Sequence, residues 1–209
     1  RGVIVRFWNI NLDTHALHLD DLKKLLSDKT KLVAFTHVSN IVGTINPVKE
    51  FTEFIHDHGA MVCVDAVAYA PHRAVDVSEW GVDFYAFSLY KTFGPHHAAL
   101  YCRMDRMTEL DNLYHYFYGK DKIPAKMEPG NANYELSYGS GAIADYLVEL
   151  GSKANEFGTD REKIESAFDL ITDHEAIIGS ELLSYLRNRN DCNIVGIDDG
   201  NNISRVPTI

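Results

Sequence analysis

Three short, largely apolar runs near the middle of the chain predict the core of its fold. Met61–Val64, Asp83–Phe87 and Ala98–Tyr101 each lead into polar or glycine- and proline-bearing chain that turns away from a sheet. Upstream, Lys31–Thr36 is nearly continuously apolar, which is typical of a strand buried on both faces of a parallel sheet. We therefore expect these four segments to be strands of one sheet.

The segment between the predicted strands Lys31–Thr36 and Met61–Val64 has the spacing of a helix. Pro47 suits a first helical position and Gly59 a helix end. Apolar and aromatic positions recur between them at Val48, Phe51, Ile55 and His58. A strand, a helix and a strand in this order predict a right-handed parallel unit.

Further elements follow from the same patterns. We expect a strand at Gly2–Trp8, a helix at Leu22–Ser27 capped by Asp20 or Asp21, a helix beginning at Met104, a loop at Glu128–Gly139, helices at Ala142–Asn155 and Thr159–Arg189, and a strand at Asn193–Ile197. The fold class predicted is α/β, a three-layer α/β/α sandwich with a mainly parallel sheet.

Composition narrows the class of protein. The 209 residues are 45% hydrophobic and carry a net charge of −10, without a cluster of basic residues to neutralise phosphates, so nucleic acid is not the expected partner. No apolar run approaches the roughly 20 residues that a membrane span needs. Three dispersed cysteines favour a reduced, cytoplasmic setting. His56-Asp57-His58 and His96-His97 lack a second ligand cluster, so no metal is expected.

Polar side chains with catalytic potential follow two neighbouring strands. Asp65 directly follows the predicted strand Met61–Val64, and Ser88 and then Lys91 follow the predicted strand Asp83–Phe87. Strand-end residues of α/β sheets gather around ligands, so the acid and the lysine are expected to face one pocket. The competing interpretations are an aspartate that caps the following turn and a lysine that is merely exposed.

The same stretch resembles a known family. The resemblance lies in Asp65, Pro71-His72, Val75-Asp76-Val77, Asp83-Phe84-Tyr85-Ala86-Phe87-Ser88, Tyr90-Lys91 and Phe93-Gly94-Pro95, with His37-Val38-Ser39-Asn40 and Gly43-Thr44-Ile45-Asn46-Pro47 upstream. Together these motifs resemble the large-domain core of fold-type-I pyridoxal-phosphate (PLP) enzymes, in the class V aminotransferase and cysteine desulfurase group. The run from Val64 to Arg73 is most similar to the cysteine desulfurase-like branch.

This resemblance implies a role for each matching residue. Lys91 would hold pyridoxal 5′-phosphate as a Schiff base and, once an amino-acid substrate displaces it, move protons at the substrate's α-carbon. Asp65 would keep the pyridine nitrogen protonated. Asn40 would bond the 3-oxygen side of the cofactor, and Val67 would pack against one face of its ring. The competing interpretations are a turn residue for Asn40 and ordinary core packing for Val67.

Three further positions concern the phosphate and the electronics of the cofactor. Ser88 and Tyr90 would hold the phosphate, Tyr90 standing where the family usually has histidine. Asn131 lies in a segment similar to the family's Gly-Thr-Pro-Asn loop, which implies a homodimer in which this loop reaches the neighbouring subunit's cofactor; a surface turn is the alternative. Ala68 departs from the family's Gln or His and puts desulfurase activity in doubt.

The resemblance also predicts how the chain is organised. We expect an excerpt of a longer protein, with residues 1–190 in a PLP-binding large domain that lacks its N-terminal part and residues 191–209 beginning a small C-terminal domain. The predicted function is a PLP-dependent transferase or lyase acting on an amino acid, either cysteine desulfurase-like or a class V aminotransferase. The alternatives are a non-catalytic remnant or interaction module that keeps the fold, and a nucleotide-binding α/β domain, which the lack of a phosphate-binding glycine loop disfavours.

Overall fold

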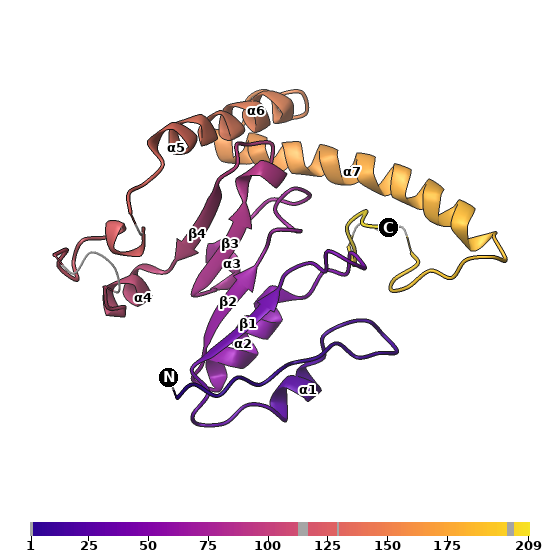
Figure 1. The fold of residues 1–209 in the computed structure, drawn as a ribbon. Coiled ribbons are helices and arrows are strands. Elements are labelled where there is room, and N and C mark those ends of the chain that lie inside the picture. The colour runs from indigo at the N-terminus through magenta and orange to yellow at the C-terminus, as the bar shows by residue number, and fades with distance from the viewer. Residues whose placement is uncertain (1, 113–116, 129, 200–202) are drawn as a thin grey trace.

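The computed structural model describes residues 2–112, 117–128, 130–199 and 203–209, and its centre is a four-stranded sheet (Figure 1). The strands lie in the order β1-β2-β3-β4, with bounds Leu32–Thr36, Met61–Asp65, Phe84–Ser88 and Ala98–Cys102. The first three run parallel, and β4 pairs with β3 antiparallel. The predicted α/β fold with a mainly parallel sheet is confirmed.

Helices connect and flank these strands. They are α1 (Leu19–Lys23), α2 (Val48–Asp57), α3 (Val77–Trp80), α4 (Met104–Glu109), α5 (Tyr134–Ser140), α6 (Ala142–Gly151) and α7 (Asp160–Arg187), with single 3-10 turns η1 (Leu89–Lys91) and η2 (Ala125–Met127). The predicted helix between β1 and β2 is α2, and Gly59 follows it with φ of 75°. This φ lies in the left-handed region that glycine adopts without strain.

One face of the sheet forms the main core. Side chains alternate along each strand, so the residues of β1, β2 and β3 that share this face are buried. They pack with α2 and are Val33, Phe35, Val62, Val64 and Tyr85 from the sheet and Val48, Phe51 and Ile55 from the helix. On the opposite face Ala34 is exposed, and Cys63 and Ala86 are half-buried.

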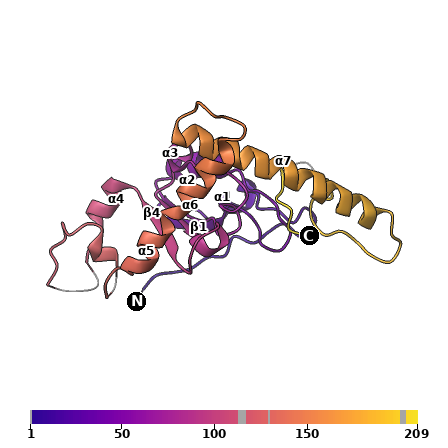
Figure 2. The same cartoon turned by 90° about the horizontal axis from the view of Figure 1, so that it is seen from above.

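The two long C-terminal helices lie across the end of the sheet where β2 and β3 finish (Figures 1 and 2). They pack together around Leu147, Ala167 and Phe168. Thr159 and Glu162 start α7 with a reciprocal capping box, in which each side chain accepts a hydrogen bond from the other's backbone N–H. Both helices fall within the ranges that the sequence predicts.

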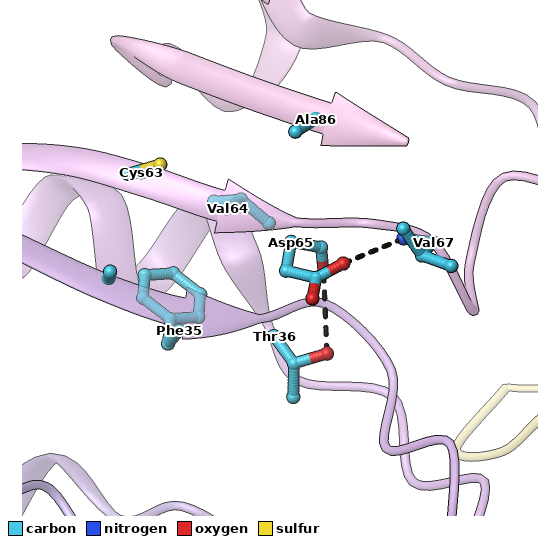
Figure 3. Close-up of a pocket in the computed structure, with 8 residues that line it drawn as sticks. Phe35, Thr36, Cys63, Val64, Asp65, Val67 and Ala86 are labelled. Carbon is cyan, nitrogen blue, oxygen red and sulfur yellow. Dashed lines mark hydrogen bonds between the residues drawn. The ribbon is translucent and has the colours of Figure 1, made fainter. Parts of the chain in front are cut away.

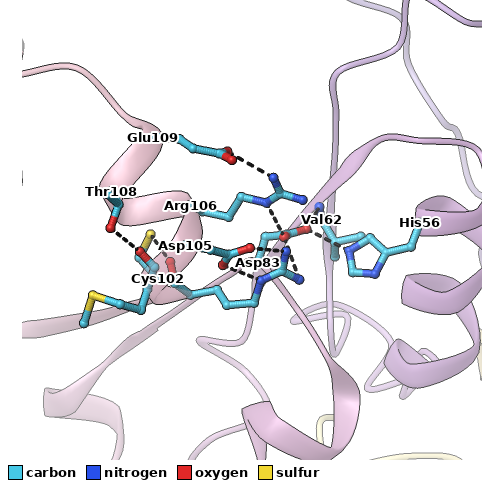
Figure 4. A network of polar contacts seen from close by, with 10 residues as sticks. His56, Val62, Asp83, Cys102, Asp105, Arg106, Thr108 and Glu109 are labelled. Carbon is cyan, nitrogen blue, oxygen red and sulfur yellow. Dashed lines mark hydrogen bonds and ion pairs between the residues drawn. The ribbon is translucent and has the colours of Figure 1, made fainter.

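A buried carboxylate holds the opposite end of the sheet together (Figure 4). Asp83 directly precedes β3 and is fully buried. Its Oδ2 accepts from the Val62 N–H and His56 Nε2, both at 2.8 Å, and its Oδ1 lies 2.9 Å from Arg106 Nε and 3.1 Å from Arg103 Nη1. Burial opposes ionisation, but the hydrogen bonds from His56, Val62 and Arg106 outweigh it and lower the pKa of Asp83.

The strand predicted at Gly2–Trp8 is wrong. Residues 2–10 have no regular structure, and Val3, Ile4 and Phe7 are more than three-quarters exposed. Only Trp8 of this segment reaches the core, where its ring lies 5.1 Å from that of Phe51. An apolar run becomes a strand only where a sheet edge accepts its backbone hydrogen bonds.

Three other predictions need correction. The helix expected at Leu22–Ser27 is α1, which starts earlier and follows His18 rather than a capping aspartate. The segment expected to be a loop, Glu128–Gly139, includes all but the last residue of α5, because the Asn133 side chain accepts from the Leu136 N–H at 2.9 Å and caps a helix there. No strand forms at Asn193–Ile197; the C-terminal pairing is instead a single bridge between Thr44 and Arg205.

Candidate active site at the carboxyl edge of the sheet

Asp65 is the last residue of β2 and presents its carboxylate at the carboxyl edge of the sheet (Figure 3). Its neighbours in register are Thr36 of β1 and Ala86 of β3. Oδ1 accepts from the Val67 N–H at 3.0 Å, whereas Oδ2 accepts no hydrogen bond from the described residues. The side chain is exposed, so this second oxygen is available to a ligand.

A hollow of about 490 Å³ opens beside Asp65. It is lined by Ala34, Phe35, Thr36, Cys63, Val64, Asp65, Val67 and Ala86. Ala34, Cys63 and Ala86 are small, and their shared face of the sheet leaves room that larger side chains would fill. Burial, with a smaller contribution from Asp65, raises the pKa of the Cys63 thiol, so the hollow has one carboxylate in otherwise uncharged surroundings.

Ser88, Tyr90 and Lys91 form a second group at the end of the neighbouring strand. Ser88 ends β3, and Tyr90 and Lys91 lie in η1 directly after it, both exposed. Three hydrogen bonds are made within this turn. Thr92 Oγ1 donates to the Ser88 carbonyl at 3.1 Å, and the N–H groups of Thr92 and Gly94 donate to the Leu89 carbonyl at 2.9 and 2.8 Å.

The structure thus places the predicted acid and the predicted lysine at the ends of adjacent parallel strands. Ala86 pairs with Asp65 in register, and Ser88 lies two residues further along the same strand. The lining of the hollow includes Asp65 and Val67, and it does not include Ser88, Tyr90 or Lys91. The site therefore has two halves on the same edge, one on β2 and one on β3.

Asn40 and Asn131 lie outside the hollow. Asn40 is exposed in the loop after β1, where Ser39 Oγ accepts from the Ile41 and Val42 N–H groups at 3.3 and 3.2 Å. Asn131 is also exposed, just before α5; Pro129 of the same motif lies outside the described residues. A contact of 3.4 Å between Ser137 Oγ and His97 Nε2 ties α5 to the loop that follows Lys91.

The sequence predicts no role for a cluster of three rings near this edge. The ring of His37 contacts those of Tyr69 and Tyr85, and all three residues are buried or half-buried. Their positions at the end of β1, after β2 and within β3 are too far apart in the sequence for a spacing rule to join them.

Among the described residues, no helix is both long and apolar enough to span a bilayer. In the same part of the chain, no three His, Cys, Asp or Glu side chains are grouped as metal ligands would be.

Comparison with known proteins identifies the family. The Aminotransferase class-V family matches residues 1–201. The chain is 37% identical over 207 residues to the aminotransferase-like protein FGM3 of Gibberella zeae, covering 98% of this chain and 48% of that protein. It is also 37% identical over 192 residues to the cysteine desulfurase-like protein ustD of Aspergillus flavus, covering 88% of this chain and 40% of that protein.

Solved structures share the fold. The cysteine desulfurase CsdA from Escherichia coli superposes with a TM-score of 0.66 at 21% identity, covering 88% of this chain and 45% of that one. The apo cysteine desulfurase from Thermococcus onnurineus NA1 superposes with a TM-score of 0.64 at 22% identity, covering 94% of this chain and 47% of that one. The fold is that of cysteine desulfurases, and the family match places the chain in a PLP-dependent class of proteins. The chain belongs to the class V aminotransferase family, and it spans about half the length of these relatives.

Family membership establishes pyridoxal 5′-phosphate as the cofactor, because class V aminotransferases and cysteine desulfurases depend on it. The residues at the edge suit this group. A carboxylate with one oxygen unengaged suits a pyridinium N–H, the hollow beside it is lined by small and apolar side chains, and Lys91 supplies a primary amine one strand away.

Proposed function

We propose that this chain is part of an enzyme that acts on an amino acid, with Lys91 as the covalent attachment point of its PLP cofactor. The observation that carries the proposal is the placement of Asp65 and Lys91 at the ends of adjacent parallel strands, with a hollow beside the carboxylate. Desulfuration and transamination both fit this arrangement, since both begin by exchanging the lysine amine for the amine of the substrate.

Asp65 has the role of holding a proton on the cofactor's ring nitrogen. The protonated ring withdraws electrons from the substrate's α-carbon, which is the chemistry that the cofactor supplies when bound. Asp65 suits this role because the Val67 N–H fixes Oδ1, and Oδ2 is left for the ring nitrogen. Val67 lines the same hollow and would pack against one face of the ring.

Lys91 would hold the cofactor covalently through its Nζ, and water would be lost when that bond forms. Once the amine of a substrate took its place, the Lys91 amine would be the base that takes up and returns the proton at the substrate's α-carbon. The hydrogen bonds of the η1 turn support this role, because they fix the backbone that carries the lysine while its side chain remains exposed.

The remaining predicted residues bind the periphery of the cofactor. Ser88 and Tyr90 would donate hydroxyl hydrogen bonds to its phosphate, and Asn40 would bond its 3-oxygen side. Asn131 reaches the phosphate of a second subunit, which makes the enzyme a homodimer. Exposed aromatic residues on the helix that follows, Tyr134 at 71% and Tyr138 at 91%, support an interface there.

Two assignments complete the proposal. Residues 1–190 form the large PLP-binding domain and residues 191–209 begin a small one, which the end of α7 at Arg187 supports. The location is cytoplasmic, which the free thiols of Cys63, Cys102 and Cys192 support.

The test is covalent labelling of Lys91. The protein is incubated with PLP, its visible spectrum is recorded, and borohydride reduction followed by peptide mass spectrometry locates the attached group. We expect a visible band and a modified Lys91, both lost in Lys91→Ala and retained in Lys29→Ala, which removes an exposed lysine elsewhere. A band without modification of Lys91 would refute the assignment of the lysine. Absence of any band from this chain and from the longer protein would favour a non-catalytic remnant.

A further inference from the structure

The turn that follows Asp65 rests on the ring of His37. His37 directly follows β1 and is 4% exposed. Its imidazole stacks face to face on Tyr69, with 3.5 Å between ring centroids and 7° between ring planes. Trp80 meets the same imidazole edge-on at 4.8 Å and 90°. His37 is therefore enclosed by rings from elements that the sequence separates.

A hydrogen bond fixes the orientation of this imidazole. His37 Nδ1 lies 2.8 Å from the hydroxyl of Tyr85, which is fully buried in β3. Burial lowers the pKa of His37 to about 3 and raises that of Tyr85, so both groups are uncharged near neutral pH. An apolar ring would fill the same space without a directional bond, and it would be free to tilt away from Tyr69.

A short path leads from this ring pair to the carboxylate of Asp65. The backbone N–H of His37 donates to the backbone carbonyl of Asp65 at 2.8 Å. Tyr69 closes the turn after Asp65, because its N–H donates to the Ala66 carbonyl at 2.9 Å. This turn contains Val67, whose N–H donates to Asp65 Oδ1 at 3.0 Å. The position of the Tyr69 ring thus sets the position of the N–H that orients the carboxylate.

We propose that His37 is a positioning residue for Asp65, and that its hydrogen bond to Tyr85 holds the turn whose Val67 N–H orients the carboxylate. The proposal rests on the function proposed above for Asp65, because it explains how that carboxylate is presented to a cofactor. It adds the imidazole of His37, the hydroxyl of Tyr85 and the ring of Tyr69, but not the Tyr69 hydroxyl, to the groups on which the site depends, although none of these residues lines the hollow.

The test compares substitutions that remove one end of the bond at a time. Tyr85→Phe removes the hydroxyl and keeps the ring, and His37→Phe keeps a ring to stack on Tyr69 but removes Nδ1. Tyr69→Phe is the matched control, since the stacking ring remains. Amide hydrogen exchange is measured at Val67, which reports the turn, and at Val62, whose N–H bonds Asp83 at the other end of β2 and reports global stability.

In Tyr85→Phe and His37→Phe we expect the exchange protection of the Val67 amide to fall about tenfold more than that of the Val62 amide, because one buried hydrogen bond is lost. In the Tyr69→Phe control, the protection of the two amides is expected to change by the same factor. A parallel fall of Val67 and Val62 in Tyr85→Phe would assign the cluster a purely structural role and overturn the proposal. Tyr85→Phe alone decides the matter if His37→Phe does not fold, because it deletes a single atom.

The exchange measurement needs no cofactor, so it stands whether or not the function proposed above is correct. Equilibrium dialysis with PLP then tests that function separately. Weaker PLP binding by Tyr85→Phe than by Tyr69→Phe supports both proposals. Failure of the unsubstituted protein to bind PLP, in a longer form as well as in this chain, counts against the proposed function alone.

Discussion

Glu175 of α7 lies 2.6 Å from His72 Nδ1, which joins the long C-terminal helix to the chain that leaves the candidate site. Its other carboxylate oxygen lies 3.2 Å from Arg73 Nη1, and all three side chains are less than a quarter exposed. The turn after Asp65 continues directly into His72 and Arg73. One carboxylate on α7 therefore anchors the far end of the segment whose near end rests on His37.

Glu175→Gln is expected to lower the free energy of unfolding by about 1–2 kcal/mol, because Arg73 loses a charged partner in a partly buried setting. Urea denaturation measures the change. Glu181→Gln removes an exposed carboxylate from the same helix and is expected to stay within about 0.5 kcal/mol of the unsubstituted protein. Equal effects of the two substitutions would show that the contact with His72 and Arg73 contributes nothing specific.

The contact between α6 and α7 leaves no room for a side chain at Gly151. A Cβ built there would lie 1.7 Å from the Lys163 carbonyl oxygen and 3.1 Å from the Ala167 backbone nitrogen. Gly151→Ala is expected to force the helices apart and destabilise the protein by about 3 kcal/mol or more. Gly139→Ala in α5, where a Cβ meets nothing within 4 Å, is expected to be neutral or to stabilise by up to about 1 kcal/mol.

Thermal unfolding of the two alanine variants separates a packing effect from a general intolerance of alanine for glycine. Gly151→Ala must have the lower melting temperature if the helices meet as described. If the two variants melt together, α6 and α7 do not approach each other at this glycine.

The sequence predicts the sheet and the long helices well because their signals are local. Apolar runs of strand length and the repeat around Val48, Phe51 and Ile55 depend only on neighbouring residues. The error at Gly2–Trp8 has the opposite cause, because a strand there needs a partner edge that composition does not reveal. The sequence predicts a loop where α5 begins although Asn133 is a standard capping residue, since the glycine and asparagine residues before it also suit a loop.

Asp83 is expected to contribute stability that depends on pH. The hydrogen bonds to Asp83 hold its pKa below the ordinary value of an aspartate in the folded protein. The stabilisation is therefore fully present well above that ordinary pKa and is lost as the pH falls through the folded-state pKa. Asp83→Asn should destabilise the protein near neutral pH by about 3 kcal/mol, because it leaves Arg103 and Arg106 without their shared carboxylate. It should also flatten the acid limb of the stability curve.

Chemical denaturation at a series of pH values measures this effect. Asp57→Asn, which removes an exposed carboxylate from α2, is the control and is expected to keep the acid limb of the unsubstituted protein. The account of Asp83 would be wrong if both variants lost stability with the same dependence on pH.

The candidate site could be predicted only in part. The placement of Asp65 and Lys91 at the ends of neighbouring strands follows from the sequence, because residues at the carboxyl ends of adjacent parallel strands come to one edge. The cluster of His37, Tyr69 and Tyr85 could not be derived in this way. It depends on ring contacts between three segments, and a buried histidine has the same sequence pattern whether it packs, binds or catalyses.

The loop that carries Asn40 is held by the C-terminal segment through Gly43. The Val206 N–H donates to the Gly43 carbonyl at 2.9 Å, and the Ile45 N–H donates to the Ser204 carbonyl at 3.0 Å. A Cβ at Gly43 would lie 2.7 Å from the Val206 carbonyl oxygen, and the φ of 70° already disfavours other residues. Gly43→Ala is therefore expected to push residues 204–208 away and to cost about 2–4 kcal/mol.

Gly59→Ala separates backbone strain from this displacement. Its φ of 75° is similar, but a Cβ there meets nothing within 4 Å, so only the strain of about 1 kcal/mol remains. In Gly43→Ala the amide of Ile45 should exchange faster than the loss of global stability alone explains. In Gly59→Ala its exchange rate should change only as much as global stability changes. If Asn40 bonds the cofactor as proposed, Gly43→Ala must also weaken PLP binding more than Gly59→Ala does. Faster amide exchange at Ile45 without weaker PLP binding would show that Asn40 does not contact the cofactor and that the loop has only a structural role.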